Sequence, residues 1–337
     1  MKATLTRRTL LAAGTALPLC AILSRRGSAA EFSYRFATGQ DPTHPNNTRA
    51  QEAIDRIHNA SGGRIDMKLF PFNQLGSDTD LLSQVRSGGV DFFTLAASIL
   101  STFVPVTGIV NTGFAFPDYA TVWQAMDGSL GQYIRAQVNK SGIISVSKIM
   151  DNGFRQVTAS TKPIVTPADL RGFKLRVPPA PMLTSLFQAL GAGPAPINFN
   201  EVYSALQTKV VEGEENGLAI IATARLYEVQ KFCSMTSHVW DGYLTLGNRA
   251  SWAALPKDLQ EIVTREIDRS ADDQRADVAK LDASLRETLT GKGLVFNDPD
   301  KALFRDALAK TSFYGDWKKK YGEEAWGLLE SYTGKLV

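Results

Sequence analysis

The histidines are the first residues in this sequence to consider for chemistry. His44, His58 and His238 lie far apart, and none has another histidine, a cysteine or a carboxylate at the spacing of a metal site. The sequence has no G-x-S-x-G nucleophile motif, and Gly291-Lys292-Gly293 lacks the other residues of a phosphate-binding loop. We predict no metal and no cofactor, and we expect His238 to make a hydrogen bond in the core.

One arginine is notable for its position in a strand pattern. In FKLRVP, residues 173–178, apolar residues alternate with Lys174 and Arg176, which is the two-residue period of a strand with one buried face. Pro178 then ends the strand. The pattern by itself predicts that Arg176 points into water.

Short apolar strands alternate with helices along the chain, which predicts an α/β fold. Strands are expected at residues 32–36, 65–70, 90–96, 143–150, 154–159 and 243–248, with Asn152-Gly153 as a break between two of them. Helices are expected at 47–60, 78–87, from Thr166, at 202–207 behind a capping box of Asn198 and Glu201, at 256–289, and twice more before the C-terminus. There is no internal repeat, so two domains would require the chain to cross between them more than once.

Residues 1–30 are interpreted as an export signal. Thr6-Arg7-Arg8-Thr9 opens a mostly apolar run to Leu23, and Ser28-Ala29-Ala30 offers small residues for cleavage near Ala30. The paired arginines favour the twin-arginine route, with an ordinary Sec signal as the alternative. We therefore predict a periplasmic protein.

Removing this segment changes the net charge. Five of the 37 basic residues and none of the 34 acidic residues lie in it, which leaves 32 basic and 34 acidic residues. No basic surface then remains to attract nucleic acid or anionic lipid. Cys233 is the one cysteine after residue 30, so no intramolecular disulfide can form and stability must come from apolar burial.

A series of short motifs between Asn152 and Asn248 carries a family resemblance. They are GFRQVT from Gly153, KPI from Lys162, ADLRGFKLRVP from Ala168, EVYSALQT from Glu201, EGEEN from Glu212 and YEVQK from Tyr227. In this series the chain resembles the substrate-binding proteins of tripartite ATP-independent periplasmic (TRAP) transporters, the DctP-type family. QLG at 74–76, GVDF at 89–92 and ALPKDLQ at 254–260 extend the resemblance over nearly all of the chain after the signal.

The resemblance implies a two-lobed α/β periplasmic binding protein fold, type II-like, with hinge strands and a long connecting helix. One lobe would comprise residues 31–152 and about 243–282, and the other 153–242 and about 283–337. A protein of this class closes on a small organic acid and delivers it to TRAP membrane permease subunits. We expect a monomer that is not an enzyme.

The resemblance also assigns the ligand site. Arg176 would hold the carboxylate of the ligand with two parallel hydrogen bonds, so that its side of the strand faces a cleft and not bulk water. Arg155 would assist, and the two arginines would repel each other in the empty cleft; a surface ion pair is the alternative for Arg155. Asn216 would bond ligand oxygens or cap a turn, and Phe199 would pack against the ligand or lie in the core. Further candidates for the cleft are Trp240, Asp241, Gln40 and Asp78.

Two departures from the family pattern bear on the ligand. Relatives commonly carry glutamine where this chain has Glu214, and we expect Glu214 on a solvated turn; facing the pocket, it would disfavour an anion or favour an added amine. Sialic-acid-binding relatives carry an acidic residue where this chain has Ala97, which argues against sialic acid.

An organic monocarboxylate is the leading hypothesis for the ligand, with sugar acids and hydroxy acids favoured and aromatic acids as the alternative. A binding protein of an ATP-driven importer would lack the motif series around Arg176. A secreted hydrolase or lyase would need an acid–base pair that meets only in the folded chain. A periplasmic sensor partner would differ from a transport binding protein only in the protein it docks against.

Overall fold

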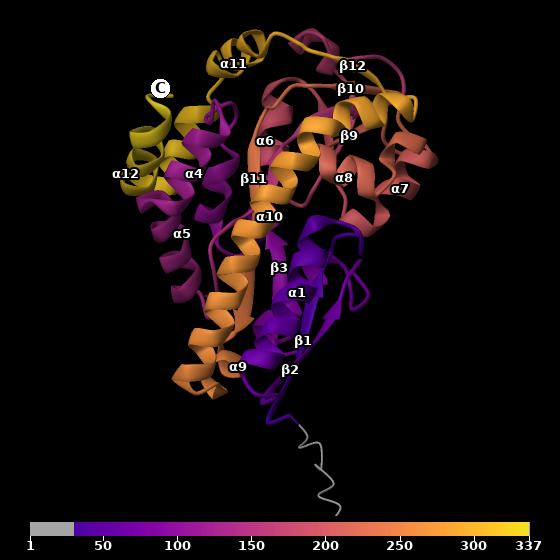
Figure 1. The fold of residues 1–337 in the computed structure, drawn as a ribbon. Coiled ribbons are helices and arrows are strands. Elements are labelled where there is room, and N and C mark those ends of the chain that lie inside the picture. The colour runs from indigo at the N-terminus through magenta and orange to yellow at the C-terminus, as the bar shows by residue number, and fades with distance from the viewer. Residues whose placement is uncertain (1–29, 337) are drawn as a thin grey trace, which may run out of the picture.

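Two mixed β-sheets organise the chain, which the computed structural model describes over residues 30–336 (Figure 1). Apart from Ala30, the predicted export signal lies outside the described residues. Among residues 30–336 no helix has the length and the apolar character that a membrane span requires.

The first sheet has the strand order β2-β1-β3-β11-β4, with β5 also paired to β11. β1 runs parallel to β2 and β3, whereas β11 is antiparallel to β3, β4 and β5. The strands are β1 (Phe32–Thr38), β2 (Ile65–Phe70), β3 (Phe92–Ala96), β4 (Ile143–Ser145), β5 (Met150–Phe154) and β11 (Trp240–Asn248). The accompanying helices are α1 (Pro45–Ala60), α2 (Asp78–Ser87), α3 (Ala97–Leu100), η1 (Pro105–Asn111), α4 (Tyr119–Asp127), α5 (Ser129–Lys140) and α9 (Arg249–Ala254).

The second sheet has the strand order β12-β10-β6-β9-β7-β8. Its strands are β6 (Gln156–Ala159), β7 (Lys174–Val177), β8 (Gly193–Pro196), β9 (Gly213–Asn216), β10 (Phe232–Ser234) and β12 (Val295–Asn297). The helices between them are η2 (Pro167–Leu170), α6 (Pro181–Ala189), α7 (Phe199–Gln207), α8 (Leu218–Thr223) and η3 (Leu226–Glu228).

The long helix α10 (Lys257–Gly291) runs along both sheets (Figure 1). It packs against α1 beside the first sheet and against α8 and β12 beside the second. β5 and β11, which it also accompanies, carry the chain between the sheets, and Gln274 of α10 bonds both the main-chain N–H and the C=O of Asp151 in β5, at 2.8 and 2.7 Å. The α/β fold with two sheets agrees with the prediction from the sequence.

The C-terminal helices return to the first part of the chain. α11 (Lys301–Ala309) leads to α12 (Phe313–Thr333), which packs against η1, α4 and α5. The expected division had placed all of residues 283–337 with the second lobe. α12 also contacts α6 of the second part of the chain, and its buried Trp326 joins a core that includes residues of both sheets. The division into lobes stays a prediction.

Several local predictions differ from the structure. Asn152-Gly153 lies inside β5 and is no break: Gly153 has a φ of 93°, which glycine tolerates within the strand. Residues 143–150 form two short strands with a gap and not one strand. The capping box of Asn198 and Glu201 does not form, since helix α7 begins at Phe199 without a side-chain cap.

Candidate functional site

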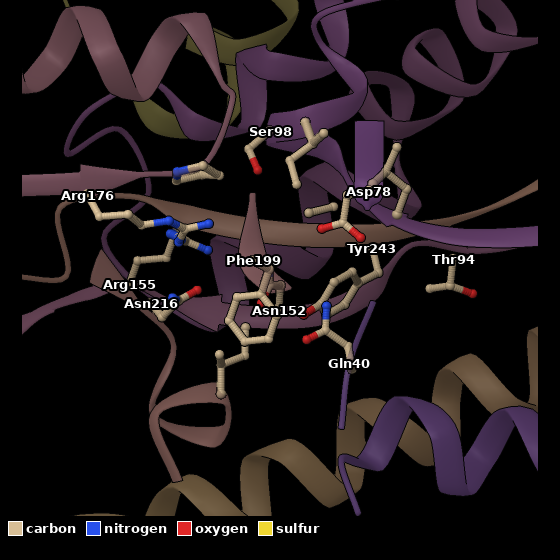
Figure 2. A pocket seen from close by; sticks show the side chains of 15 residues that line it. Gln40, Asp78, Thr94, Ser98, Asn152, Arg155, Arg176, Phe199, Asn216 and Tyr243 are labelled. Carbon is tan, nitrogen blue, oxygen red and sulfur yellow. The ribbon is translucent and has the colours of Figure 1, made fainter. Parts of the chain in front are cut away.

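A cavity lies between the two sheets and is lined by side chains from both (Figure 2). Six of the eight candidate ligand residues line it: Gln40, Asp78, Arg155, Arg176, Phe199 and Asn216. The first sheet and its helices contribute Gln40 and Asp78, and the second sheet and its helices contribute Arg176, Phe199 and Asn216. The chain thus brings these residues together from segments far apart in the sequence.

Arg176 is buried, with 1% of its surface exposed, so the strand pattern taken alone was wrong about its direction. Its Nε and Nη2 donate to the main-chain carbonyl of Ile197 at 3.0 and 2.9 Å, which holds the side chain in place. No carboxylate of the described residues lies within ion-pair distance of this guanidinium, and Phe199 stands 6.0 Å from it. Burial lowers the pKa of Arg176 to about 10, so the side chain is charged at neutral pH.

Arg155 already has a charge partner. Its Nε and Nη2 donate to the two carboxylate oxygens of Glu215, at 2.5 and 2.9 Å, and both side chains are buried. A surface ion pair, the alternative considered for Arg155, is therefore wrong. The Arg155 charge still lowers the pKa of Arg176, as expected for two arginines that repel each other. The positive charge that remains without an acidic partner is that of Arg176.

Glu215 is held in its charged form by its neighbours. Burial alone would raise the pKa of Glu215, but Arg155 and the hydrogen bond from His238 lower it to about 2. His238 Nε2 lies 3.0 Å from the Glu215 carboxylate and its Nδ1 lies 2.8 Å from the Thr236 hydroxyl. The predicted core hydrogen bond of His238 is confirmed.

Asp78 and Gln40 form the first-lobe side of the cavity. Asp78 is the first residue of α2, whose start is fixed by a capping box between Ser77 and Asp80. Its carboxylate accepts a hydrogen bond of 2.9 Å from Asn73, and burial raises its pKa. A carboxylate on this wall would repel a second carboxylate of a ligand and would accept hydrogen bonds from hydroxyl groups.

Trp240 and Asp241 do not line the cavity, contrary to the expectation from the sequence. Trp240 packs against Phe116 and Trp123, and its Nε1 donates to Asp151 at 2.9 Å. The Asp241 carboxylate accepts from the Ser98 hydroxyl at 2.6 Å and from Asn152 Nδ2 at 3.2 Å. Both residues lie in β11, where they support the wall from behind.

Two cavity residues, Asn152 and Tyr243, were not predicted as ligand contacts. Both line the cavity, from β5 and β11, and both are buried. Among the described residues neither Asn152 Oδ1 nor the Tyr243 hydroxyl has a hydrogen-bond partner. Polar atoms that are buried and unpartnered at the edge of a cavity are available to a ligand. Their positions depend on the pairing of β5 with β11, which has no local signal in the sequence.

Glu214 is fully buried in β9, so its expected place on a solvated turn is wrong. It lies behind the cavity wall and does not line it. No group of three or more His, Cys, Asp and Glu residues among residues 30–336 could hold a metal ion.

Comparison with known proteins identifies the class to which this fold and site belong. Residues 36–314 match the family described as bacterial extracellular solute-binding protein, family 7, or DctP. The chain belongs to this family. Over 282 residues it is 31% identical to the 2,3-diketo-L-gulonate-binding periplasmic protein YiaO of Escherichia coli, covering 83% of this chain and 86% of that protein.

Solved structures agree with this assignment. A TRAP periplasmic solute-binding protein from Polaromonas, bound to D-erythronate, superposes with a TM-score of 0.86 and 26% identity over 90% of this chain and 100% of that one. A second, from Roseobacter denitrificans with bound L-galactonate, has a TM-score of 0.84 and 27% identity over 90% of this chain and 99% of that one. The matched proteins are TRAP-type binding proteins with the two-lobed fold, and they are not enzymes.

Proposed function

We propose that this protein captures a hydroxylated organic monocarboxylate, a sugar acid or a small hydroxy acid, in the periplasm and delivers it to the membrane subunits of a TRAP transporter. One side chain carries the proposal: Arg176 is a buried guanidinium on the cavity wall without an acidic partner among the described residues. A buried charge of this kind is stabilised when an anion joins it.

The carboxylate of the ligand would bind on the Arg176 side of the cavity. Nε and Nη2 of Arg176 are fixed by Ile197, and its Nη1 makes no hydrogen bond to the described residues. Nη1 therefore has donors for the ligand, and Nη2 has a second hydrogen beyond the one given to Ile197. Each charge-assisted hydrogen bond contributes about 1.5–3 kcal/mol.

The opposite wall favours hydroxyl groups over a second carboxylate. Asp78 and Tyr243 lie there, away from Arg176 in Figure 2, and their oxygens, like the unpartnered Asn152 Oδ1 of the cavity wall, can accept from hydroxyl groups. A dicarboxylate would place a negative charge against Asp78, whereas the hydroxyl groups of a sugar acid would donate to these oxygens. Relatives named or crystallised with 2,3-diketo-L-gulonate, D-erythronate and L-galactonate support the same ligand class.

The two lobes already contact each other directly beside the cavity. Asn198, next to Phe199, donates from Nδ2 to the hydroxyl of Thr79, next to Asp78, at 3.1 Å. A ligand held by Arg176 on one lobe and by Asp78 on the other would add further bonds that exist only in the closed form. Such differential binding shifts the hinge equilibrium towards closure.

A thermal-shift screen of the purified protein tests the proposal. The panel contains D-erythronate, L-galactonate and D-gluconate, with succinate, benzoate and uncharged D-galactose as the competing classes. A ligand at a hundred times its Kd stabilises the folded protein by about 2.7 kcal/mol, which raises the midpoint by several degrees. We expect the hydroxy monocarboxylates to stabilise the protein. Stabilisation by D-galactose alone would contradict a carboxylate site, and stabilisation by succinate or benzoate alone would contradict the hydroxylated class.

A further inference from the structure

A buried acidic residue stands behind each of two asparagines of the cavity wall. Glu214 lies two residues before Asn216 in β9, and Asp241 in β11, the strand partner of Gly153, accepts a hydrogen bond from Asn152 in β5. Neither acid lines the cavity, and both are fully buried. These acids make no direct contact with a ligand, so they position it through the side chains they hold.

Both oxygens of Glu214 are occupied by donors. The Thr158 hydroxyl donates to Oε1 at 2.7 Å, and Asn216 Nδ2 donates to Oε2 at 2.5 Å. Burial and the neighbouring Glu215 charge raise the pKa of Glu214, and the hydrogen bonds from Thr158 and Asn216 and the nearby Arg176 charge offset part of that rise. In the structure both Glu214 oxygens therefore accept hydrogen bonds, one from Thr158 and one from Asn216.

The direction of the Asn216 amide follows from this. Because Glu214 only accepts, the Asn216 nitrogen must turn towards it, and Figure 2 shows the amide oxygen of Asn216 directed into the cavity. Asn152 repeats the arrangement: its nitrogen donates to Asp241 at 3.2 Å, and its buried oxygen has no partner among the described residues. Each acid thus orients one asparagine so that its amide oxygen is available to the ligand.

We propose that Glu214 is a specificity-determining positioning residue, which fixes Asn216 as an acceptor for the hydroxyl group next to the carboxylate of the ligand. Asn216 and Arg176 line the same cavity (Figure 2), and Glu214, which holds Asn216, is the strand partner of Arg176, so the ligand group that reaches Asn216 is close to the carboxylate held by Arg176. A hydroxyl on that carbon donates to the amide oxygen, whereas a hydrogen in its place leaves the oxygen unpaired. A ligand amine is not bound by Glu214, because its two oxygens are taken and it does not reach the cavity.

A glutamine at position 214 would remove this constraint. Its side-chain amide has one oxygen and one nitrogen, and the Thr158 hydroxyl can donate or accept, so Asn216 could turn either way. The inference rests on the proposed function, since it concerns the same cavity and the same carboxylate.

Calorimetry with matched acids tests the inference. Three pairs differ only in the 2-hydroxyl group: D-glycerate and 3-hydroxypropionate, D-erythronate and 3,4-dihydroxybutanoate, and D-gluconate and 2-deoxy-D-gluconate. We expect the unaltered protein to bind the 2-hydroxy member of a pair at least about tenfold more tightly. In Glu214→Gln this preference should fall below about threefold, whereas Glu212→Gln, a control in the same segment outside the cavity, should keep it.

Asn216→Ala, which removes the acceptor itself, serves as the second variant if Glu214→Gln does not fold, and it should lose the preference to the same extent. Equal affinity of the unaltered protein for both members of every pair it binds would overturn the inference and leave the proposed function standing. An unchanged preference in a folded Glu214→Gln, or in Asn216→Ala, would also overturn it. Failure to bind any carboxylate would contradict the proposed function and, with it, this inference.

Discussion

Arg176 and Glu214 are paired residues of the neighbouring parallel strands β7 and β9, yet the guanidinium of Arg176 bonds the main-chain carbonyl of Ile197 and not the carboxylate of Glu214. The two carboxylate oxygens of Glu214 accept hydrogen bonds from Thr158 and Asn216. The second sheet thus places a cation and an anion side by side without joining them. The cation remains available to a ligand.

The ion pair of Arg155 and Glu215 should be required for stability. Glu215→Gln would remove the carboxylate that accepts from Arg155 Nε and Nη2 and leave only Asp241, 3.8 Å away, as an acidic neighbour. We expect a loss of about 3–5 kcal/mol in the free energy of unfolding at neutral pH, measured by urea denaturation. Glu261→Gln, at an exposed position of α10, should change that free energy by less than about 0.5 kcal/mol. A Glu215→Gln protein as stable as the control would show that the pair does not stabilise the fold.

The same pair predicts the acid dependence of stability. The folded pKa of Glu215, about 2, lies below the ordinary value of 4.5, so the pair stabilises the fold above that value and the effect is lost as the pH falls towards 2. This group should therefore remove about 2–3 kcal/mol of the free energy of unfolding between about pH 5 and pH 2. Glu215→Gln should show a correspondingly shallower dependence; an unchanged slope would contradict the assignment.

Asp282 of α10 should make the folded protein less stable as the pH rises, which is opposite to the effect of Glu215. Burial raises its pKa to about 6, its Oδ1 has no partner among the described residues, and Oδ2 accepts from the Tyr119 hydroxyl at 3.3 Å. The folded protein therefore binds a proton here between about pH 4 and pH 6 that the unfolded chain releases, so stability falls as the pH rises through this range. At pH 8 we expect Asp282→Asn to be more stable than the unaltered protein by roughly 1–3 kcal/mol.

The control for this prediction is Glu287→Gln, an exposed position on the same helix, which should have little effect. If urea denaturation shows Asp282→Asn to be the less stable protein at pH 8, the charged Asp282 carboxylate does not destabilise the folded state, and the prediction is wrong.

Gly39 gives Asp78 the room to reach the cavity wall. A β-carbon at position 39 would lie 2.3 Å from Asp78 Oδ1, closer than atoms can approach, so Gly39→Ala must displace the carboxylate. We expect roughly tenfold weaker binding of the hydroxy monocarboxylate found in the screen, measured by calorimetry, because a first-lobe acceptor moves away. Gly315→Ala is a control with open space around the added carbon and no positive φ. Unchanged affinity in Gly39→Ala would show that Asp78 does not contribute to ligand binding.

The sequence predicted most accurately what depends on neighbours along the chain. Helix α2 runs over Asp78–Ser87 as expected, because its capping box and the left-handed Gly88 act within a few residues of its ends. The position of Arg176 on the cavity followed from the family motif around it. Its strand pattern alone pointed to water, because alternation cannot distinguish a polar face in solvent from one in a cavity.

What the sequence could not predict depends on distant partners. Glu214 was misplaced because its burial requires Thr158, which is 56 residues away on the adjacent strand. The ion pair of Arg155 and Glu215 likewise forms only because the fold brings β9 next to Arg155, which lies between β5 and β6. Asn152 and Tyr243 were missed as cavity residues because a β-bulge between Asp241 and Gly242 sets their final register.

Calorimetric titration of Arg176→Ala with the acid that binds the unaltered protein tests the central claim most directly. Loss of the guanidinium should weaken binding by about 3–5 kcal/mol, which is more than a hundredfold in Kd, since the carboxylate loses its cationic partner in a buried site. Lys174→Ala, on the exposed face of the same strand, should bind as the unaltered protein does. A folded Arg176→Ala that loses less than tenfold in affinity would contradict the account.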